Sequence, residues 1–473
     1  MPRLLRERPR PQRVRAHQYA PWFAVGAVCV GAFMGQLDAS IVTLIFPALQ
    51  RRFDAPLAAV QWVAVAYLLA LVALLIAAGR LADVAGRKLI YLYGFVVFTG
   101  ASVACGFAPS LAALVACRVV QAAGAAMLQA NSVALVVTSV RRERARAALG
   151  MQAAAQSLGL ALGPTAGGFL VGSADWRWVF WINAPVGLVA IVAGRYLLPR
   201  TREHSRPGAF DWGGLLLLGT ATTGLLLAAS GASGLGLPVF PIVALLSVAL
   251  ASAAGLRAWE RRASSPLLDV TVLRSGVVAG LAGALCAYLV LFGPLVLFSQ
   301  VLVASGLREP HAGLVLSALP AGFAFSALTA DHLAPRRWGN RARCVTGALV
   351  ALGATALLAI TPTAPGPLAC FLALLGLGLG LFVPANNAAV MAAVPARTSA
   401  TAGGMINMAR GIGTALGVAG VTLALYLAGG PGTAGARLAL GMLGAAALVA
   451  ALTATPACAR VAEVSGRRPR PDP

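Results

Sequence analysis

Residues 34–47 read MGQLDASIVTLIFP and lie in the first long apolar segment of the chain. Asp38 is the only charged residue between Tyr19 and Arg51. The whole apolar segment is long enough to cross a bilayer as a helix. An ionised carboxylate inside a bilayer costs about 2.5 to 3.5 kcal/mol and needs a partner, a water cavity or a bound proton. We therefore interpret Asp38 as a functional residue; the alternative is a structural ion pair that holds helices together.

The composition excludes an ordinary soluble protein. The chain has 473 residues, of which 59% are hydrophobic and 11% are charged, whereas soluble domains carry roughly 25% charged residues. The seven cysteines and four histidines have no metal or disulfide spacing. We expect no metal site, no cofactor and no enzyme activity, because a membrane enzyme or receptor needs a catalytic constellation or a large soluble domain.

The apolar segments predict an all-α membrane protein with fourteen transmembrane helices, since each span needs about 20 mostly apolar residues. The predicted spans lie near residues 21–47, 57–79, 89–108, 111–138, 146–172, 177–198, 211–231, 236–256, 275–303, 310–334, 343–362, 366–391, 398–428 and 433–456.

Basic residues predict the orientation of these spans. Of the 37 Lys and Arg residues, 30 fall in ends and loops assigned to the inside, and five fall outside, at Arg51, Arg52, Arg177, Arg308 and Arg437. Positive charge stays on the cytoplasmic side, so both termini are expected there, in a multi-pass protein of the cytoplasmic (inner) cell membrane. The net charge of +23 therefore follows topology, and no nucleic-acid partner is expected.

The loop after the second span, residues 79–88, reads GRLADVAGRK. Its candidate residues are Gly79, Asp83, Gly86, Arg87 and Lys88. Glycine allows a tight turn, Asp83 can pair with a basic group or cap a helix, and Arg87 and Lys88 are expected to face the anionic leaflet. The pattern resembles the cytoplasmic signature loop of the major facilitator superfamily.

The fourth span contains Arg118, Gln121 and Gly124 in a spacing that resembles that superfamily's helix-4 motif. Arg118 and Asp38 lie at similar distances from the predicted outer ends of their helices, at about 1.5 Å per residue. They could pair or share a water. We predict that both act in proton coupling, and that role requires a pairing that is not permanent.

The fifth span carries glycines every four residues, which permit close helix packing, and a proline that favours a bend. The string resembles the antiporter motif of proton-driven exporters, which implies a hinge and seal at the outer gate. Its residues are Gly159, Gly163, Pro164, Gly167 and Gly168.

The chain resembles the fourteen-helix drug:proton antiporter family in three features. These are residues 37–42 (LDASIV), the segment 176–187 and the number of predicted spans. The resemblance implies two six-helix bundles with two extra helices between them. The expected domains are an Arg-rich tail (1–20), an N-terminal bundle (21–198), a linker with two helices (199–274), a C-terminal bundle (275–456) and a tail (457–473).

The function that these motifs predict is proton-coupled export of small amphipathic molecules, such as drugs or antibiotics, by a monomer in the lipid bilayer. The proton gradient supplies the energy. The predicted spans 9 and 11 to 14 carry no Asp or Glu, which favours neutral, zwitterionic or anionic cargo. Candidate cargo contacts are Gln36, Gln129, Asn131, Asn183, Asn387, Asn407 and Arg410, each of which could instead serve helix packing. An exporter of an endogenous lipid or metabolite and a proton-coupled nutrient importer of the same fold remain alternatives.

Overall fold

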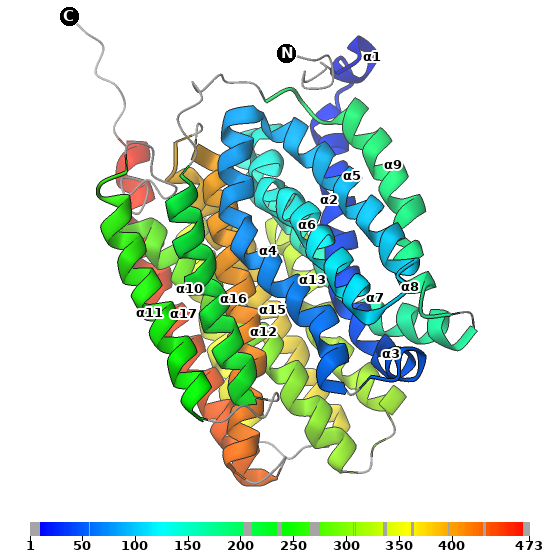
Figure 1. Ribbon diagram of the computed structural model, residues 1–473. Helices are drawn as coiled ribbons and strands as arrows, with labels where there is room; N and C mark the ends of the chain where they lie inside the picture. The colour runs from blue at the N-terminus through cyan, green and yellow to red at the C-terminus, as the bar shows by residue number, and fades with distance from the viewer. Residues whose placement is uncertain are drawn as a thin grey trace, which may run out of the picture. The chain divides into compact units, whose positions relative to one another are not determined.

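The computed structural model describes residues 10–55, 57–173, 175–201, 211–233, 239–263, 275–305, 307, 309–333, 338–360, 364–395, 398–428 and 432–466. Over these residues the secondary structure is helical, without strands (Figure 1). Contacts divide the chain into two compact units. The first comprises Met1–Leu268 and Arg397–Ile412, and the second comprises Asp269–Ala396 and Gly413–Pro473.

The first unit contains α1 (Gln12–Arg15), α2 (Ala20–Ile41), η2 (Val42–Ile45), α3 (Phe46–Phe53), α4 (Leu57–Ala85), α5 (Arg87–Gly106), α6 (Leu111–Ser139), η3 (Arg142–Arg144), α7 (Ala145–Ser173), α8 (Trp178–Trp181), α9 (Asn183–Leu197), α10 (Trp212–Ser233) and α11 (Val239–Glu260). The second contains α12 (Ser275–Ala304), α13 (Glu309–Leu333), α14 (Asn340–Ile360), α15 (Pro365–Ala392) and α17 (Thr433–Gly466). Helix α16 (Ser399–Leu427) contributes residues up to Ile412 to the first unit and the rest to the second.

Every predicted span coincides with helix, but the described residues hold twelve helices that are long and apolar enough to cross a membrane. Helices α7 and α10 are not among the twelve, and the apolar part of α10 is the shorter stretch Trp212–Ala228. The chain is thus a multi-pass helical membrane protein, with twelve candidate spans among its described residues where fourteen were predicted.

Two predicted spans are interrupted. The first continues from α2 through the short 3₁₀ helix η2 into α3, whose first turn holds a proline, a position where a missing N–H costs nothing. The span after α7 changes at Ile182 from α8 to α9. Pro185 follows in the first turn of α9 and provides no N–H for the carbonyl of Trp181, which weakens the helix at this junction.

Close helix packing in the first unit depends on glycines. A Cβ atom at Gly159 of α7 would lie 2.5 Å from the carbonyl oxygen of Phe33 on α2, and one at Gly124 of α6 would lie 2.8 Å from Cα of Phe98 on α5. A Cβ at Gly403 of α16 would lie 2.6 Å from the carbonyl oxygen of Ala130 on α6. These backbones approach so closely that no side chain fits between them.

Helices α10 and α11 pack side by side, as the green pair in Figure 1 shows. Asp211 accepts a hydrogen bond from the backbone N–H of Gly214 at 2.7 Å and one from Nε1 of Trp259 at 2.8 Å. The carboxylate therefore caps the start of α10 and joins it to the end of α11. Helix α10 also packs against α4, so both helices belong to the first unit.

In the second unit α15 packs against α13 and α14, and α12 packs against α17. Glycine contacts recur here, since a Cβ at Gly347 of α14 would lie 2.6 Å from the carbonyl oxygen of Gly378 on α15. Asp331 near the end of α13 forms an ion pair with Arg343 of α14. The sequence around Asp331 echoes the Asp83 loop, and it too joins two helix ends through an Asp–Arg pair.

Candidate functional site: a buried ion pair among amides

Asp38 on α2 and Arg118 on α6 form a salt bridge, with 2.7 Å between Oδ2 and Nη1. Each residue is only 1% exposed. Their similar depth predicted either a direct pair or a shared water, and the structure has the direct pair. An ion pair removed from water is tolerable only when its remaining polar atoms are also satisfied, so the surroundings of the pair decide what it can do.

Two amides complete the coordination of the Asp38 carboxylate. Gln121 of α6 and Asn183 of α9 donate to Oδ1 at 3.0 and 3.1 Å. Both amides also donate to the hydroxyl of Ser102 on α5, at 3.1 and 2.9 Å, and this hydroxyl donates to the carbonyl of Phe180 at 3.0 Å. The carboxylate therefore accepts three hydrogen bonds, one from the guanidinium and two from amides.

Arg118 has further partners besides Asp38. Its Nη1 donates to Oε1 of Gln121 at 2.6 Å and its Nε to the carbonyl of Val63 at 3.1 Å. The guanidinium carbon lies 4.0 Å from the centre of the Tyr67 ring, within the range of a cation–π interaction. These contacts hold the guanidinium in place independently of the carboxylate.

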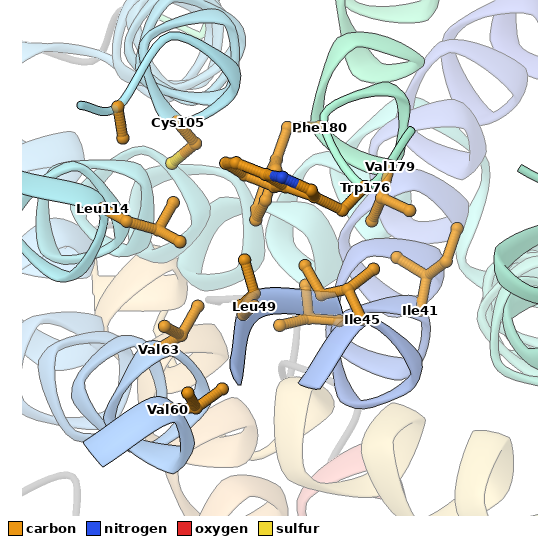
Figure 2. Close-up of a cluster of buried hydrophobic side chains, with 12 residues drawn as sticks. Ile41, Ile45, Leu49, Val60, Val63, Cys105, Leu114, Trp176, Val179 and Phe180 are labelled. Carbon is orange, nitrogen blue, oxygen red and sulfur yellow. The ribbon is translucent and has the colours of Figure 1, made fainter. Parts of the chain in front are cut away.

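Figure 2 shows an apolar cluster of buried side chains. It adjoins the ion pair, because Arg118 donates to the carbonyl of Val63 and lies 5.9 Å from the centre of the Phe180 ring. The Trp176 ring lies at its centre, 6.1 Å from the Phe180 ring, and η2, α3, α4 and α6 supply Ile45, Leu49, Val63 and Leu114. In the predicted orientation this cluster lies on the outer side of Asp38. The side chains of the twelve buried residues of this cluster are almost fully buried.

The signature loop contains a second charge cluster. Asp83 pairs with Arg87 at 3.3 Å, and its Oδ2 accepts the backbone N–H and the hydroxyl of Thr401 at 2.9 and 2.7 Å. Thr401 lies in the first turn of α16, where a negative charge is favourable. Gly79 lies within α4, and Gly86 has a positive φ of 106°, which a glycine adopts without strain. Asp83 therefore joins α4, α5 and the start of α16.

The expectation that Arg87 and Lys88 face the lipid leaflet was wrong. Lys88 is 1% exposed, and its Nζ donates to the carbonyls of Arg195 and Leu198 at 2.9 and 2.8 Å. Arg87 is 9% exposed and pairs with Asp83. The last carbonyls of a helix have no intrahelical partner, and Lys88 supplies one for the end of α9.

The antiporter motif lies on α7, which packs against α2. Gly163 faces Ser40, whose Cβ would be 2.7 Å from a Cβ at the glycine, and Ser40 also lies 3.5 Å from the carbonyl of Gly159. The predicted close approach of this glycine face is confirmed at these two positions. The packing around Pro164, Gly167 and Gly168 is not among the described parts of the structure.

Three of the candidate cargo residues gather in the first unit. Asn407 donates to the carbonyl of Gln129 at 2.7 Å, and Arg410 donates to the amide oxygens of Asn407 and Gln156 at 2.8 and 2.7 Å. Gln156 was not predicted. Arg410 thus donates to amide oxygens on α7 and on its own helix, while Asn183 belongs to the Asp38 cluster.

The other cargo candidates lie elsewhere. Asn131 donates to the carbonyl of Met127 at 2.7 Å and is buried, while its Oδ1 has no partner. Asn387 is a residue of the second unit and likewise has a buried, unpartnered Oδ1. Gln36 is partly buried on α2. Ser102 and Tyr67 were missed entirely, because a single Ser or Tyr in an apolar helix carries no sequence signal.

The family model described as Major Facilitator Superfamily matches residues 28–418 of the chain. The protein belongs to the Major Facilitator Superfamily. Its helical fold is thus that of a membrane transporter of this superfamily.

Two curated relatives of this superfamily chain are named for resistance. The multidrug resistance protein Stp of Mycobacterium tuberculosis is 33% identical over 410 residues, covering 85% of this chain and 75% of that protein. The tetracenomycin C resistance and export protein of Streptomyces glaucescens is 32% identical over 407 residues, covering 84% and 75%.

Among solved structures, the human organic anion transporter MFSD10 has a TM-score of 0.67 at 15% identity, covering 92% of this chain and 99% of that one. This similarity shows the Major Facilitator Superfamily fold alone.

Proposed function

We propose that this protein is a proton-coupled antiporter that exports small amphipathic molecules, such as antibiotics, across the cytoplasmic membrane by alternating access. The relatives named for drug resistance and export support the direction and the class of cargo. The observation that carries the proposal is the buried carboxylate of Asp38, whose charge is compensated by Arg118 and by two amides. A carboxylate at this depth marks a proton path more often than a structural contact.

Protonation of Asp38 changes the net charge of this site and the interactions of Arg118. The added proton removes the charge that Arg118 neutralises, while Arg118 keeps the amide oxygen of Gln121, the carbonyl of Val63 and the ring of Tyr67. The pair can therefore separate without leaving the guanidinium unsatisfied. A proton drives transport only if it favours one conformation over the other, and a pair that separates on protonation provides such a difference.

The finer features of the proposal follow from the sequence. The protein would act as a monomer with fourteen spans, in two six-helix bundles and two extra helices, with both termini in the cytoplasm. The string around Pro164 on α7 would serve as the hinge of the outer gate. Cargo would be neutral, zwitterionic or anionic and would contact the polar residues around Asn407 and Arg410. The proton gradient would be the only energy source of transport.

The test is export with and without a proton gradient. Cells with and without the protein are exposed to a panel of antibiotics and dyes, with and without a protonophore, and an affected compound is followed in oriented proteoliposomes. We expect the Asp38→Asn variant to lose gradient-driven export. The matched control is Asp175→Asn, since Asp175 pairs with Arg177 at 3.1 Å but is 44% exposed at its side chain; this variant should keep export.

Two outcomes would contradict the proposal. One is full gradient-dependent export by Asp38→Asn. The other is gradient-driven uptake instead of export in oriented vesicles, which would favour a nutrient importer. A panel without any affected drug, together with export of a cellular lipid or metabolite, would assign the same mechanism to an endogenous cargo.

A further inference from the structure

The hydrogen bonds at Asp38 are all donated to the carboxylate. Oδ2 accepts a hydrogen bond from the guanidinium of Arg118, and Oδ1 accepts hydrogen bonds from the side-chain amides of Gln121 and Asn183. A proton on Oδ2 would face the guanidinium, so Oδ1 is the oxygen that takes it. In the present arrangement that proton would meet two N–H donors and no acceptor, so protonation requires one amide to turn.

Asn183 is the amide that can turn. Gln121 is fixed in its orientation, because its Oε1 accepts from Arg118 at 2.6 Å and reversal would bring two donors together. Asn183 donates to Asp38 and to Ser102 through the same nitrogen. After reversal, its oxygen would accept the new proton of Asp38.

Ser102 then changes its donor bond. Its hydroxyl now accepts from both amides and gives its one proton to the carbonyl of Phe180. With the oxygen of Asn183 facing it, the hydroxyl turns to donate there, and the carbonyl of Phe180 loses its bond. Phe180 lies in α8, next to the break at Ile182, and its ring is part of the apolar cluster in Figure 2.

We propose that Ser102 is a positioning residue that transmits the protonation state of Asp38, through Asn183, to the junction of α8 and α9. Protonation loosens this junction and with it the apolar cluster around Trp176 and Phe180. The inference rests on the proposed proton coupling and deepens it, since it names the step that joins the carboxylate to the junction of α8 and α9.

The titratable groups that face this site come from three helices. Arg118 of α6 contacts the carboxylate, Tyr67 of α4 covers the guanidinium, and the thiol of Cys105 on α5 lies 3.9 Å from Oε1 of Gln121. Among the described contacts, α7, α8 and α9 add polar groups at the site but no ionisable partner of Asp38. Asp38 is therefore the group whose protonation would rearrange the hydrogen bonds of Asn183 and Ser102.

The experiment is hydrogen–deuterium exchange of the amides of residues 178–186 in the full chain, in lipid nanodiscs, with Asp38→Asn as the mimic of the protonated acid. We expect Asp38→Asn to raise exchange in this segment roughly fivefold, the effect of one lost hydrogen bond of about 1 kcal/mol. Ser102→Ala should raise it equally, and adding Asp38→Asn to Ser102→Ala should then change nothing. Ser102→Thr, which keeps the hydroxyl, should behave as the wild type.

A pH series separates signalling from simple structural damage. After correction for the intrinsic exchange rate, wild-type exchange in the segment should rise as the pH falls, whereas Ser102→Ala should give a flat profile. Thr355→Val is the control, because Thr355 is a buried hydroxyl that bonds to Ala351 of its own helix in the second unit. It should leave the segment and its pH profile unchanged.

The relay is overturned if Asp38→Asn leaves the segment unchanged, or if its full effect persists with Ser102→Ala. If Ser102→Ala does not fold, Asn183→Ala replaces it, and in that background Asp38→Asn should again have no effect. Loss of export in Asp38→Asn without any exchange response would overturn the relay and leave the antiport proposal intact. An exchange response with unimpaired export would support the relay and overturn proton coupling.

Discussion

At the scale of single residues, the Asp38–Arg118 pair contributes little net stability, but removal of one partner is strongly destabilising. A buried pair gains little over apolar residues of equal volume, but removal of one partner leaves a charge without compensation. Asp38 has no other cation within bonding distance among the described contacts, whereas Arg118 also bonds to Val63 and Gln121. Loss of the arginine should therefore be the more damaging change.

We predict that Arg118→Ala lowers stability by about 3 to 5 kcal/mol unless Asp38 binds a proton. Adding Asp38→Asn removes the stranded charge, so the double variant should be more stable than the sum of the single effects by at least about 1 kcal/mol. Thermal unfolding of the purified protein, followed by tryptophan fluorescence, gives the comparison. Strictly additive effects would show that the two side chains do not interact in the folded protein.

At the scale of helices, packing is controlled by glycines on one helix that meet backbone atoms or a small side chain of its neighbour. Helix α7 meets α2 at Gly159 and Gly163, with Phe33 and Ser40 on the other side. A carbonyl oxygen such as that of Phe33 belongs to the backbone and cannot move as a side chain does. The approach of α2 and α7, and thereby the depth of Asp38, depends on the absence of a side chain there.

We predict that Gly159→Ala destabilises the protein by about 1 to 3 kcal/mol, because the methyl group would overlap the carbonyl of Phe33. Gly26→Ala on α2 is the matched control. It meets nothing within 4 Å and should be neutral or stabilising by up to about 1 kcal/mol, the helix preference of alanine over glycine. The measurement is the unfolding temperature of both variants. Equal unfolding temperatures would contradict the close packing.

At the scale of the whole molecule, the number of spans depends on α7 and α10, which are not among the twelve candidate spans. The asymmetry of 30 inside and five outside basic residues would stay the same if α10 and α11 both failed to cross, so the crossing of this pair needs a direct test. Helix α11 begins near Phe240, which is 82% exposed, and is followed by the exposed Arg261. These two positions should lie on opposite sides of the membrane.

We predict that a cysteine in place of Phe240 reacts with a membrane-impermeant maleimide added to intact cells. A cysteine in place of Arg261 should react only after the cells are permeabilised. The seven native cysteines are first replaced, and the parent without cysteines is the control. Protection of both positions in intact cells would show that α10 and α11 do not cross, and the fourteen-span topology would then be wrong.

The sequence alone determined the class of protein, the helices and their order, because twenty apolar residues in a row leave a chain few alternatives in a bilayer. It also placed Asp38 and Arg118 at similar depth, which left a direct pair or a shared water open until the structure gave the direct pair. The glycine spacing of α7 likewise predicted its close approach to α2 at Gly159 and Gly163.

Only the tertiary structure decided which polar groups meet. These helices are apolar around most of their circumference, so the period of 3.6 residues does not indicate which face turns inward. Ser102 therefore joined the Asp38 cluster, and Lys88 was buried at the end of α9, without any signal in the sequence. Asn183 was predicted as a cargo contact, but its place beside Asp38 was not. The reason is physical: the depth of a residue follows from counting along the chain, but the rotation of each helix about its axis is fixed by its neighbours.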